Sequence, residues 1–154
     1  MLRLSKKADY ALIAMKHLAQ RPDGASASAR EIAEAYDIPL ELLAKVLQRL
    51  VRARLLLSVQ GTRGGYRLGR AASAIPVADV IQSVDGPVAV TACSTDDHNC
   101  DQFSKCSIRD PLWKIRSRIV DALNMVSVAE LAVDAPPVEP ARIVSRMTLV
   151  MPHD

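Results

Sequence analysis

All three cysteines of this 154-residue chain lie in one short polar stretch, Cys93-STDDHN-Cys100-DQFSK-Cys106. Thiolates are soft, anionic ligands that suit iron–sulfur clusters and zinc. A polar loop lets three sulfurs converge on one point, whereas successive positions of a strand face opposite sides. In a reducing compartment, an odd and clustered set of cysteines favours a metal or redox site over a disulfide framework.

Zinc is the strongest competitor to a cluster at this site. Cys93, His98, Cys100 and Cys106 could form a Cys3His tetrahedron. Structural zinc sites usually contain a close Cys-x2-4-Cys pair, whereas the intervals here hold six and five residues. The wider spacing favours a cluster, which needs a fourth ligand from elsewhere. Simple buried or redox-reactive thiols are less favoured, because the neighbouring residues are polar.

The segments before the cysteines predict three helices followed by a hairpin. Apolar residues recur at helical spacing, and Ser28 opens the second helix with Glu31 placed as in a capping box. LLLSVQ and GYRLG then have strand character and are joined by GTRG. The order is that of a winged helix-turn-helix, in a mainly α fold with a small β wing. The helices are expected over residues 6–18, 28–37 and 39–54.

The third helix has an apolar stripe, expected to be buried, and a polar outer face. The stripe comprises Leu42, Leu43, Val46, Leu47 and Leu50. Many small folds with a hairpin bind no nucleic acid, but the glycine-rich basic turn at the wing favours DNA binding. The residues predicted to read bases are Leu40, Glu41, Ala44, Lys45 and Gln48. Those predicted to anchor the DNA backbone are Ser28, Arg30, Arg49, Arg63 and Arg67.

Two further helices flank the cysteine stretch. IPVADVIQSVDGP predicts a short helix stopped by Gly86 and Pro87. DPLWKIRSRIVDALNMVSVAEL predicts a long helix with Asp110 as its cap and Pro111 at the first helical position. Its apolar stripe predicts a homodimer seam, although packing on its own domain is the alternative reading. The seam residues are Leu112, Ile115, Ile119 and Leu123.

Composition and organisation limit the possible functions. The net charge of +3 permits nucleic-acid binding without demonstrating it. We expect a cytoplasmic protein, because no signal peptide and no apolar run of roughly 20 residues is visible. No phosphate loop or Ser/His/Asp grouping suggests an enzyme. The expected division is a DNA-binding domain over 1–70, the cysteine loop and dimerisation helix over 71–133, and a flexible tail over 134–154.

Several segments together resemble one known family. LSKKADYAL, IPLELLAKVLQRLVRARLL with SVQGTRGGYRL, VADVIQSVDGP, and three cysteines before DPLWKI are similar to the Rrf2 family of winged-helix iron–sulfur regulators. The resemblance covers roughly residues 1–133, and the sequence of these motifs is most similar to that of regulators of the Suf cluster-assembly operon. It implies a dimeric transcription factor whose cluster lies between the cysteine loop and the neighbouring subunit.

The resemblance also bears on the fourth ligand. IscR-like members use a histidine three positions after the last cysteine, where this chain has Arg109, which cannot ligate iron. NsrR-like members use an acidic residue from the partner's first helix, and Asp9 occupies that place. The resemblance therefore implies a 4Fe-4S or labile cluster rather than 2Fe-2S. An ordinary surface role for Asp9, ligation by His98 or water, a nitric-oxide or redox signal, and a zinc-stabilised regulator remain alternatives.

Overall fold

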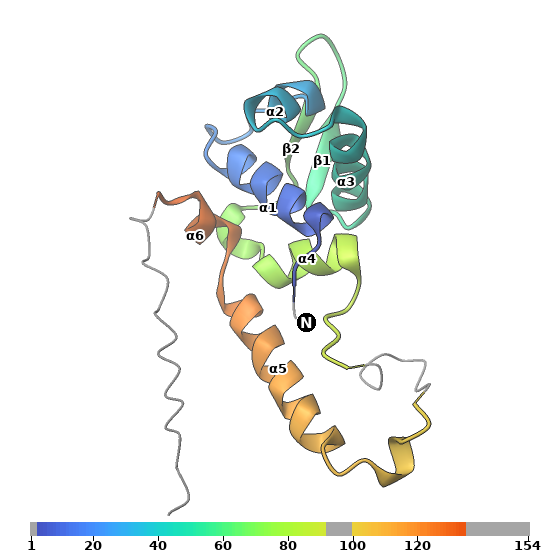
Figure 1. Cartoon of the computed structure of the whole chain (residues 1–154). Coiled ribbons are helices and arrows are strands. Elements are labelled where there is room, and N and C mark those ends of the chain that lie inside the picture. The colour runs from blue at the N-terminus through green and yellow to red at the C-terminus, as the bar shows by residue number, and fades with distance from the viewer. Residues whose placement is uncertain (1–2, 92–99, 135–154) are drawn as a thin grey trace, which may run out of the picture.

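The computed structural model describes residues 3–91 and 100–134, which form a helical body and a projecting arm (Figure 1). Cys93, His98 and residues 135–154 of the predicted tail lie outside the described residues. The elements, in chain order, are α1 Lys6–Ala19, α2 Ala29–Ala35, α3 Leu40–Arg52, β1 Leu56–Val59, β2 Gly65–Leu68, η1 Ala72–Ala74, α4 Val77–Asp85, η3 Phe103–Lys105, α5 Arg109–Met125 and α6 Val128–Ala132.

The first helices begin at serine caps. The Ser5 hydroxyl accepts a hydrogen bond from the Ala8 amide, and the Ser28 hydroxyl accepts one from the Glu31 amide. These contacts satisfy amides that a helix leaves without a partner in its first turn. Only this half of the predicted capping box is present at α2, because the Glu31 carboxylate pairs with Arg21 instead.

The wing is an antiparallel hairpin in which Leu56 of β1 faces Leu68 of β2 and Val59 faces Gly65. Tyr66 also bridges to Ala27, just before α2, so the wing is joined to the helix-turn-helix. A Cβ atom at Gly65 would lie 2.3 Å from the Ala27 carbonyl oxygen. The close backbone approach that the wing glycine permits is therefore to the chain itself.

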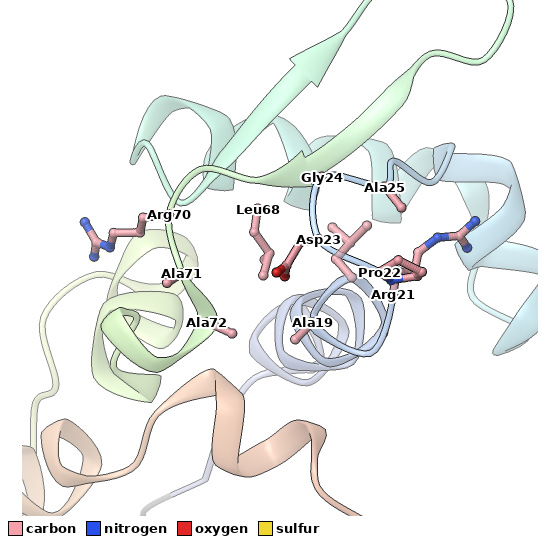
Figure 2. A pocket seen from close by; sticks show the side chains of 11 residues that line it. Ala19, Arg21, Pro22, Asp23, Gly24, Ala25, Leu68, Arg70, Ala71 and Ala72 are labelled. Carbon is pink, nitrogen blue, oxygen red and sulfur yellow. The ribbon is translucent and has the colours of Figure 1, made fainter.

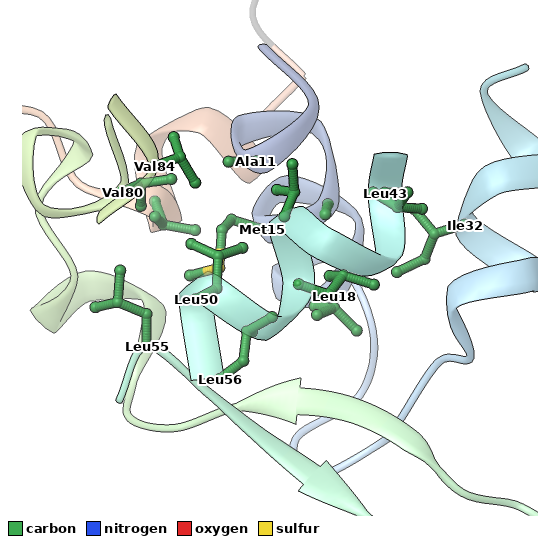
Figure 3. Close-up of a cluster of buried hydrophobic side chains, with 14 of the residues drawn as sticks. Ala11, Met15, Leu18, Ile32, Leu43, Leu50, Leu55, Leu56, Val80 and Val84 are labelled. Carbon is green, nitrogen blue, oxygen red and sulfur yellow. The ribbon is translucent and has the colours of Figure 1, made fainter. Parts of the chain in front are cut away.

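One hydrophobic core joins α1, α2 and α3 with α4 and α6 (Figure 3). Leu43, Leu47 and Leu50 of α3 are fully buried, as their helical spacing predicts. Leu42 was expected in the same buried stripe, but it is 44% exposed. The prediction for Leu42 is wrong because α1 and the wing cover only a narrower strip of α3, and Leu42 lies at its edge.

The long helix predicted after the cysteines is two helices. Val126 and Ser127 interrupt it, and Ser127 forms a capping box with Glu130 that starts α6. Two backbone hydrogen bonds hold this break against the start of α4: Val77 N to Val126 O at 2.8 Å and Val128 N to Ile75 O at 2.9 Å. α6 therefore returns to the body, while α5 forms the arm (Figure 1).

Helix α5 begins slightly earlier than predicted, and Asp110 is inside its first turn instead of being its cap. The preceding Ile108 is the N-cap residue and provides no side-chain hydrogen bond. Asp110 instead accepts a hydrogen bond from Arg109 Nε at 3.0 Å. No residue of α5 is buried, in contrast to every other α-helix of the described chain.

Candidate nucleic-acid interface and cysteine site

The outer face of α3 is open, as the sequence predicts. Leu40 is 39% exposed, and Glu41, Lys45, Gln48 and Arg49 are exposed too, with Ala44 half-buried. The opposite face holds the helix firmly on the core, so this outer surface is presented by a rigid element. Such a helix fits the major groove, which is wide enough to admit one.

The wing and α2 place the other predicted DNA contacts. Arg63 lies in the connection between β1 and β2, and its carbonyl oxygen accepts a hydrogen bond from Ser26 Oγ at 3.0 Å. Arg67 is exposed on β2, and Arg30 is exposed on α2. The Ser28 hydroxyl already accepts a hydrogen bond as the cap of α2, which leaves its proton available for donation.

One basic cluster was not predicted as a whole from the sequence. Lys7 of α1 joins Lys45 and Arg49 of α3 around a hollow of about 70 Å³, with Leu42 and Val46 as its apolar walls. We call this the Lys7 hollow. The signal in the sequence is a pair of lysines in the first turn of a helix, where the macrodipole disfavours cations.

A hydrogen bond to the end of α4 fixes the side chain of Arg49. Its Nη1 atom donates a hydrogen bond of 2.6 Å to the Val84 carbonyl oxygen, in the last turn of α4. The same turn holds α1, because Ser5 Oγ donates to Asp85 Oδ1 at 2.5 Å. The end of α4 therefore contacts the first helix and the helix predicted to read DNA.

Two of the three cysteines can be placed. Cys100 and Cys106 are half-buried and are not joined by a disulfide. Between them η3 forms a short turn, in which the Phe103 amide donates to the Cys100 carbonyl oxygen at 3.0 Å. Half-exposed free thiols on both sides of a tight turn fit soft-metal ligands, and Cys93 would have to supply the third sulfur. Within 3–91 and 100–134, no group of three His, Cys, Asp or Glu side chains could hold a metal ion.

Arg109, which stands where a ligating histidine was considered, stabilises the cysteine turn. Its guanidinium lies 4.7 Å from the Phe103 ring centroid and 5.8 Å from that of Trp113. Its Nη1 atom donates to the Phe103 carbonyl oxygen at 3.3 Å. Cation–π contacts and this hydrogen bond fasten η3 to the start of α5.

Asp9 lies half-buried in the first turn of α1, and its carboxylate has no ion pair or side-chain hydrogen bond within the described chain. Figure 1 shows the segment 100–108, which contains Cys100 and Cys106, at the outer end of α5, away from α1. A helix of 17 residues spans about 25 Å. Within one chain, the structure therefore does not bring Asp9 together with Cys100 and Cys106, the two cysteines of the described residues.

The predicted dimer seam is accessible along α5. Ile115 is 47% exposed, while Leu112, Ile119 and Leu123 are half-buried. Ile119 and Leu123 line a groove of about 370 Å³ with Leu4 and the segment that leaves α4. Arg116 Nε, donating to the Val88 carbonyl oxygen at 2.6 Å, ties the arm to that segment.

Another hollow of about 330 Å³ lies between the end of α1 and η1 (Figure 2). Its two arginines point away from it, because Arg21 pairs with Glu31 and Arg70 pairs with Asp79. Asp23 is left as the lining carboxylate, so no set of polar groups converges there.

His17 links α1 to α2 through a polar network. Its Nδ1 atom lies 3.0 Å from the Tyr36 hydroxyl, and its Nε2 atom lies 3.3 Å from Arg21 Nη1. Burial, with the nearby Arg21 charge, lowers the pKa of His17 below the usual 6.5, although Glu31 opposes this shift. A neutral imidazole fits, because its Nε2 faces a cationic donor.

Relatives and solved structures agree on the family. The family described as "Rrf2: Iron-dependent Transcriptional regulator" matches residues 4–134. The HTH-type transcriptional regulator IscR of Vibrio cholerae is 35% identical over 86% of this chain and 76% of its own length. IscR of Erwinia tasmaniensis is 37% identical over 84% and 78%.

The fold is similar to that of solved regulators. The structure of CymR, the global cysteine regulator of B. subtilis, has a TM-score of 0.68 and 28% identity, covering 86% of this chain and 97% of that one. T. potens IscR has a TM-score of 0.66 and 27% identity, covering 84% and 85%. No described helix is both long and apolar enough to cross a membrane. With its winged helix-turn-helix and its open α3 face, the chain belongs to the Rrf2 family of DNA-binding transcriptional regulators.

Proposed function

We propose that this regulator is a homodimer that senses iron–sulfur status, in the manner of Suf-type control, through a cluster on Cys93, Cys100 and Cys106. The observation that carries the proposal is the pair of free, half-exposed thiols beside η3 at the tip of an unburied helix. Soft sulfur ligands at an accessible tip suit a cluster that is gained and lost. When bound, the cluster would supply Fe–thiolate bonds that hold the cysteine segment in one arrangement.

A second copy of the chain would have a role at both ends of α5: at the apolar groove near the body and at the cysteine segment at the tip. The half-exposed apolar stripe of the arm and the groove beside Ile119 and Leu123 offer apolar surface that one chain leaves open to water. Pairing two copies of α5 would bury this surface symmetrically, as isologous dimers do. Because α1 lies away from the segment 100–108 within one chain, the proposal assigns ligation by Asp9 to the partner subunit.

Ligation by a partner residue would couple the cluster to DNA. Helix α1 packs directly on α3, so freeing Asp9 would loosen the support of the recognition helix. A swing in operator occupancy from 1% to 99% needs about 5.5 kcal/mol of differential stabilisation, which the loss of several metal–ligand bonds can supply. The proposal favours 4Fe-4S over an IscR-like 2Fe-2S site, because Arg109 stands where IscR-like members have a histidine and an arginine cannot ligate iron.

The test is anaerobic purification with measurement of iron, sulfide and visible absorbance. The protein should be brown and should lose its colour when Cys93, Cys100 or Cys106 is replaced by alanine. Ser104→Ala, between the two described cysteines, is the matched control and should stay coloured. A colourless protein containing zinc would replace this proposal with the zinc-stabilised regulator.

Asp9→Ala tests the fourth ligand separately. The substitution should change the cluster's spectrum or shorten its lifetime in air, whereas Glu34→Ala, an exposed carboxylate on α2, should do neither. An unchanged spectrum for Asp9→Ala would assign the fourth position to another group and leave the three cysteines in place.

A further inference from the structure

We infer that the Lys7 hollow is a binding site for one phosphodiester of the DNA backbone, and that its arginine is aimed by the last turn of α4. The inference deepens the proposed function, because it rests on α3 being the helix that meets DNA. It adds α1 to the DNA-contacting elements and assigns Arg49 two simultaneous partners.

The charge of the hollow indicates an anion. Lys7, Lys45 and Arg49 line it together, and within residues 3–91 and 100–134 none of the three forms an ion pair with a carboxylate. Three neighbouring cations repel one another, and this repulsion is relieved when an anion binds between them. A phosphate oxygen is the anion that a DNA duplex offers at regular spacing.

The placement of Lys7 strengthens this reading. A lysine in the first turn of an α-helix opposes the positive end of the macrodipole, which disfavours a cation there. Lys6 and Lys7 are both there, but only Lys7 lines the hollow. The two lysines therefore form a natural matched pair with equal charge, adjacent positions and different surroundings.

The fixed guanidinium of Arg49 suits a phosphate of the DNA backbone. One end of its guanidinium donates to the Val84 carbonyl oxygen at 2.6 Å, which fixes the orientation of the planar group. Arg49 also lines the hollow, and a guanidinium presents a fixed fork of donors that matches phosphate oxygens. Leu42, 44% exposed at the rim of the same hollow, gives apolar contact for the deoxyribose next to such a phosphate.

The hydrogen bond between Arg49 and Val84 would also connect the Lys7 hollow to the cysteine segment. Val84 and Asp85 close α4, and the chain then runs through Val88, which Arg116 holds, towards the cysteines. A shift of the cysteine segment that moves this last turn would move Arg49 and, through Ser5, the first turn of α1 that carries Lys7. Both sides of the hollow would then lose their alignment.

The experiment compares Lys7→Gln with Lys6→Gln in the full-length protein, using a mixed-sequence DNA duplex, because a phosphate contact does not depend on sequence. Binding is measured over a series of salt concentrations. Lys7→Gln should lower the slope of log K against log[salt] by about 0.9, the value for one released counterion, and Lys6→Gln should leave it unchanged. Equal slopes for the two variants would overturn the site. If the wild-type protein binds no duplex, the proposed function fails as well.

Arg49→Lys tests the orientation. Lysine keeps the charge but cannot donate to Val84 and hold a phosphate with a planar fork, so duplex binding should weaken about tenfold. Arg52→Lys, an exposed change on the same helix, should bind as the wild type does, and thermal unfolding should confirm that both variants are folded. Wild-type affinity for Arg49→Lys would refute the assignment of two simultaneous partners to Arg49.

Discussion

The body and the α5 arm both carry apolar residues at helical spacing but bury them very differently. In the body, Leu43, Leu47 and Leu50 of α3 are fully covered by the core. In the arm, no residue of α5 is buried, and Ile115 is 47% exposed. Helical periodicity is the same signal in both regions. An apolar stripe at helical spacing therefore indicates that the helix packs against another surface. It does not say whether that surface belongs to the same chain or to another one.

Truncating one aliphatic side chain in each region should show the largest contrast. Leu47→Ala should lower the free energy of unfolding by about 2–5 kcal/mol, because it opens a cavity in the core. Ile115→Ala should change it little when the protein is dilute enough to be monomeric. Chemical denaturation at low concentration measures both, and a large loss for Ile115→Ala would mean that the arm packs on its own body.

A charge on the arm should break the proposed dimer without unfolding the body. Placing a carboxylate at Ile115 with Ile115→Glu should weaken dimerisation by roughly 3 kcal/mol, about a hundredfold in the dissociation constant. Light scattering coupled to size exclusion gives the mass, and circular dichroism confirms the helices. Lys114→Glu, its exposed neighbour, is the control. A dimer that survives Ile115→Glu unchanged would place the interface elsewhere.

Substituting one arginine in the wing and one in the arm should show which of the two regions contacts DNA. Arg63→Ala in the wing should weaken DNA binding and reduce its salt dependence by about 0.9 in slope, because one phosphate contact is lost. Arg118→Ala, exposed on α5, should leave both unchanged. Fluorescence anisotropy across a salt series makes the comparison, and identical slopes for wild type and Arg63→Ala would remove the wing from the interface.

The smallest expected effect is a pH dependence inside the body. Because burial lowers the pKa of His17, the unfolded chain binds a proton below pH 6.5 more readily than the folded chain does. Stability is therefore unaffected above that value and falls as the pH drops below it. His17→Gln should flatten this acid-side loss in melting temperature. If the loss at low pH is the same in the variant, other groups cause it.

Sequence patterns predicted the body well because its elements carry local signals. Helical spacing located α1 to α3, and serine caps marked the starts of α1 and α2. Gly86, with a φ of 81°, ended α4 as expected. The break between α5 and α6 was missed, although Ser127 and Glu130 have the spacing of a capping box. The apolar stripe continued across the break, and only the hydrogen bonds to α4 show that the chain turns back there.

The sequence predicted which residue types form the candidate site, but it did not predict which side chains contact one another there. Cys100 and Cys106 stand out by chemistry alone, and Arg109 by its position after them. That Arg109 packs between Phe103 and Trp113 depends on how η3 turns against α5. The assembly of Lys7 with Lys45 and Arg49 was beyond reach for the same reason, since these residues are far apart along the chain.

By itself, the sequence determined which segments are helical, where the wing lies, and that three thiols are gathered before a long amphipathic helix, because each of these follows from neighbouring residues. The tertiary structure decided that Leu42 is exposed, that Arg49 is held by Val84, and that α5 leaves its apolar face only partly covered. These features depend on which surfaces distant elements cover, and periodicity within one helix does not encode that.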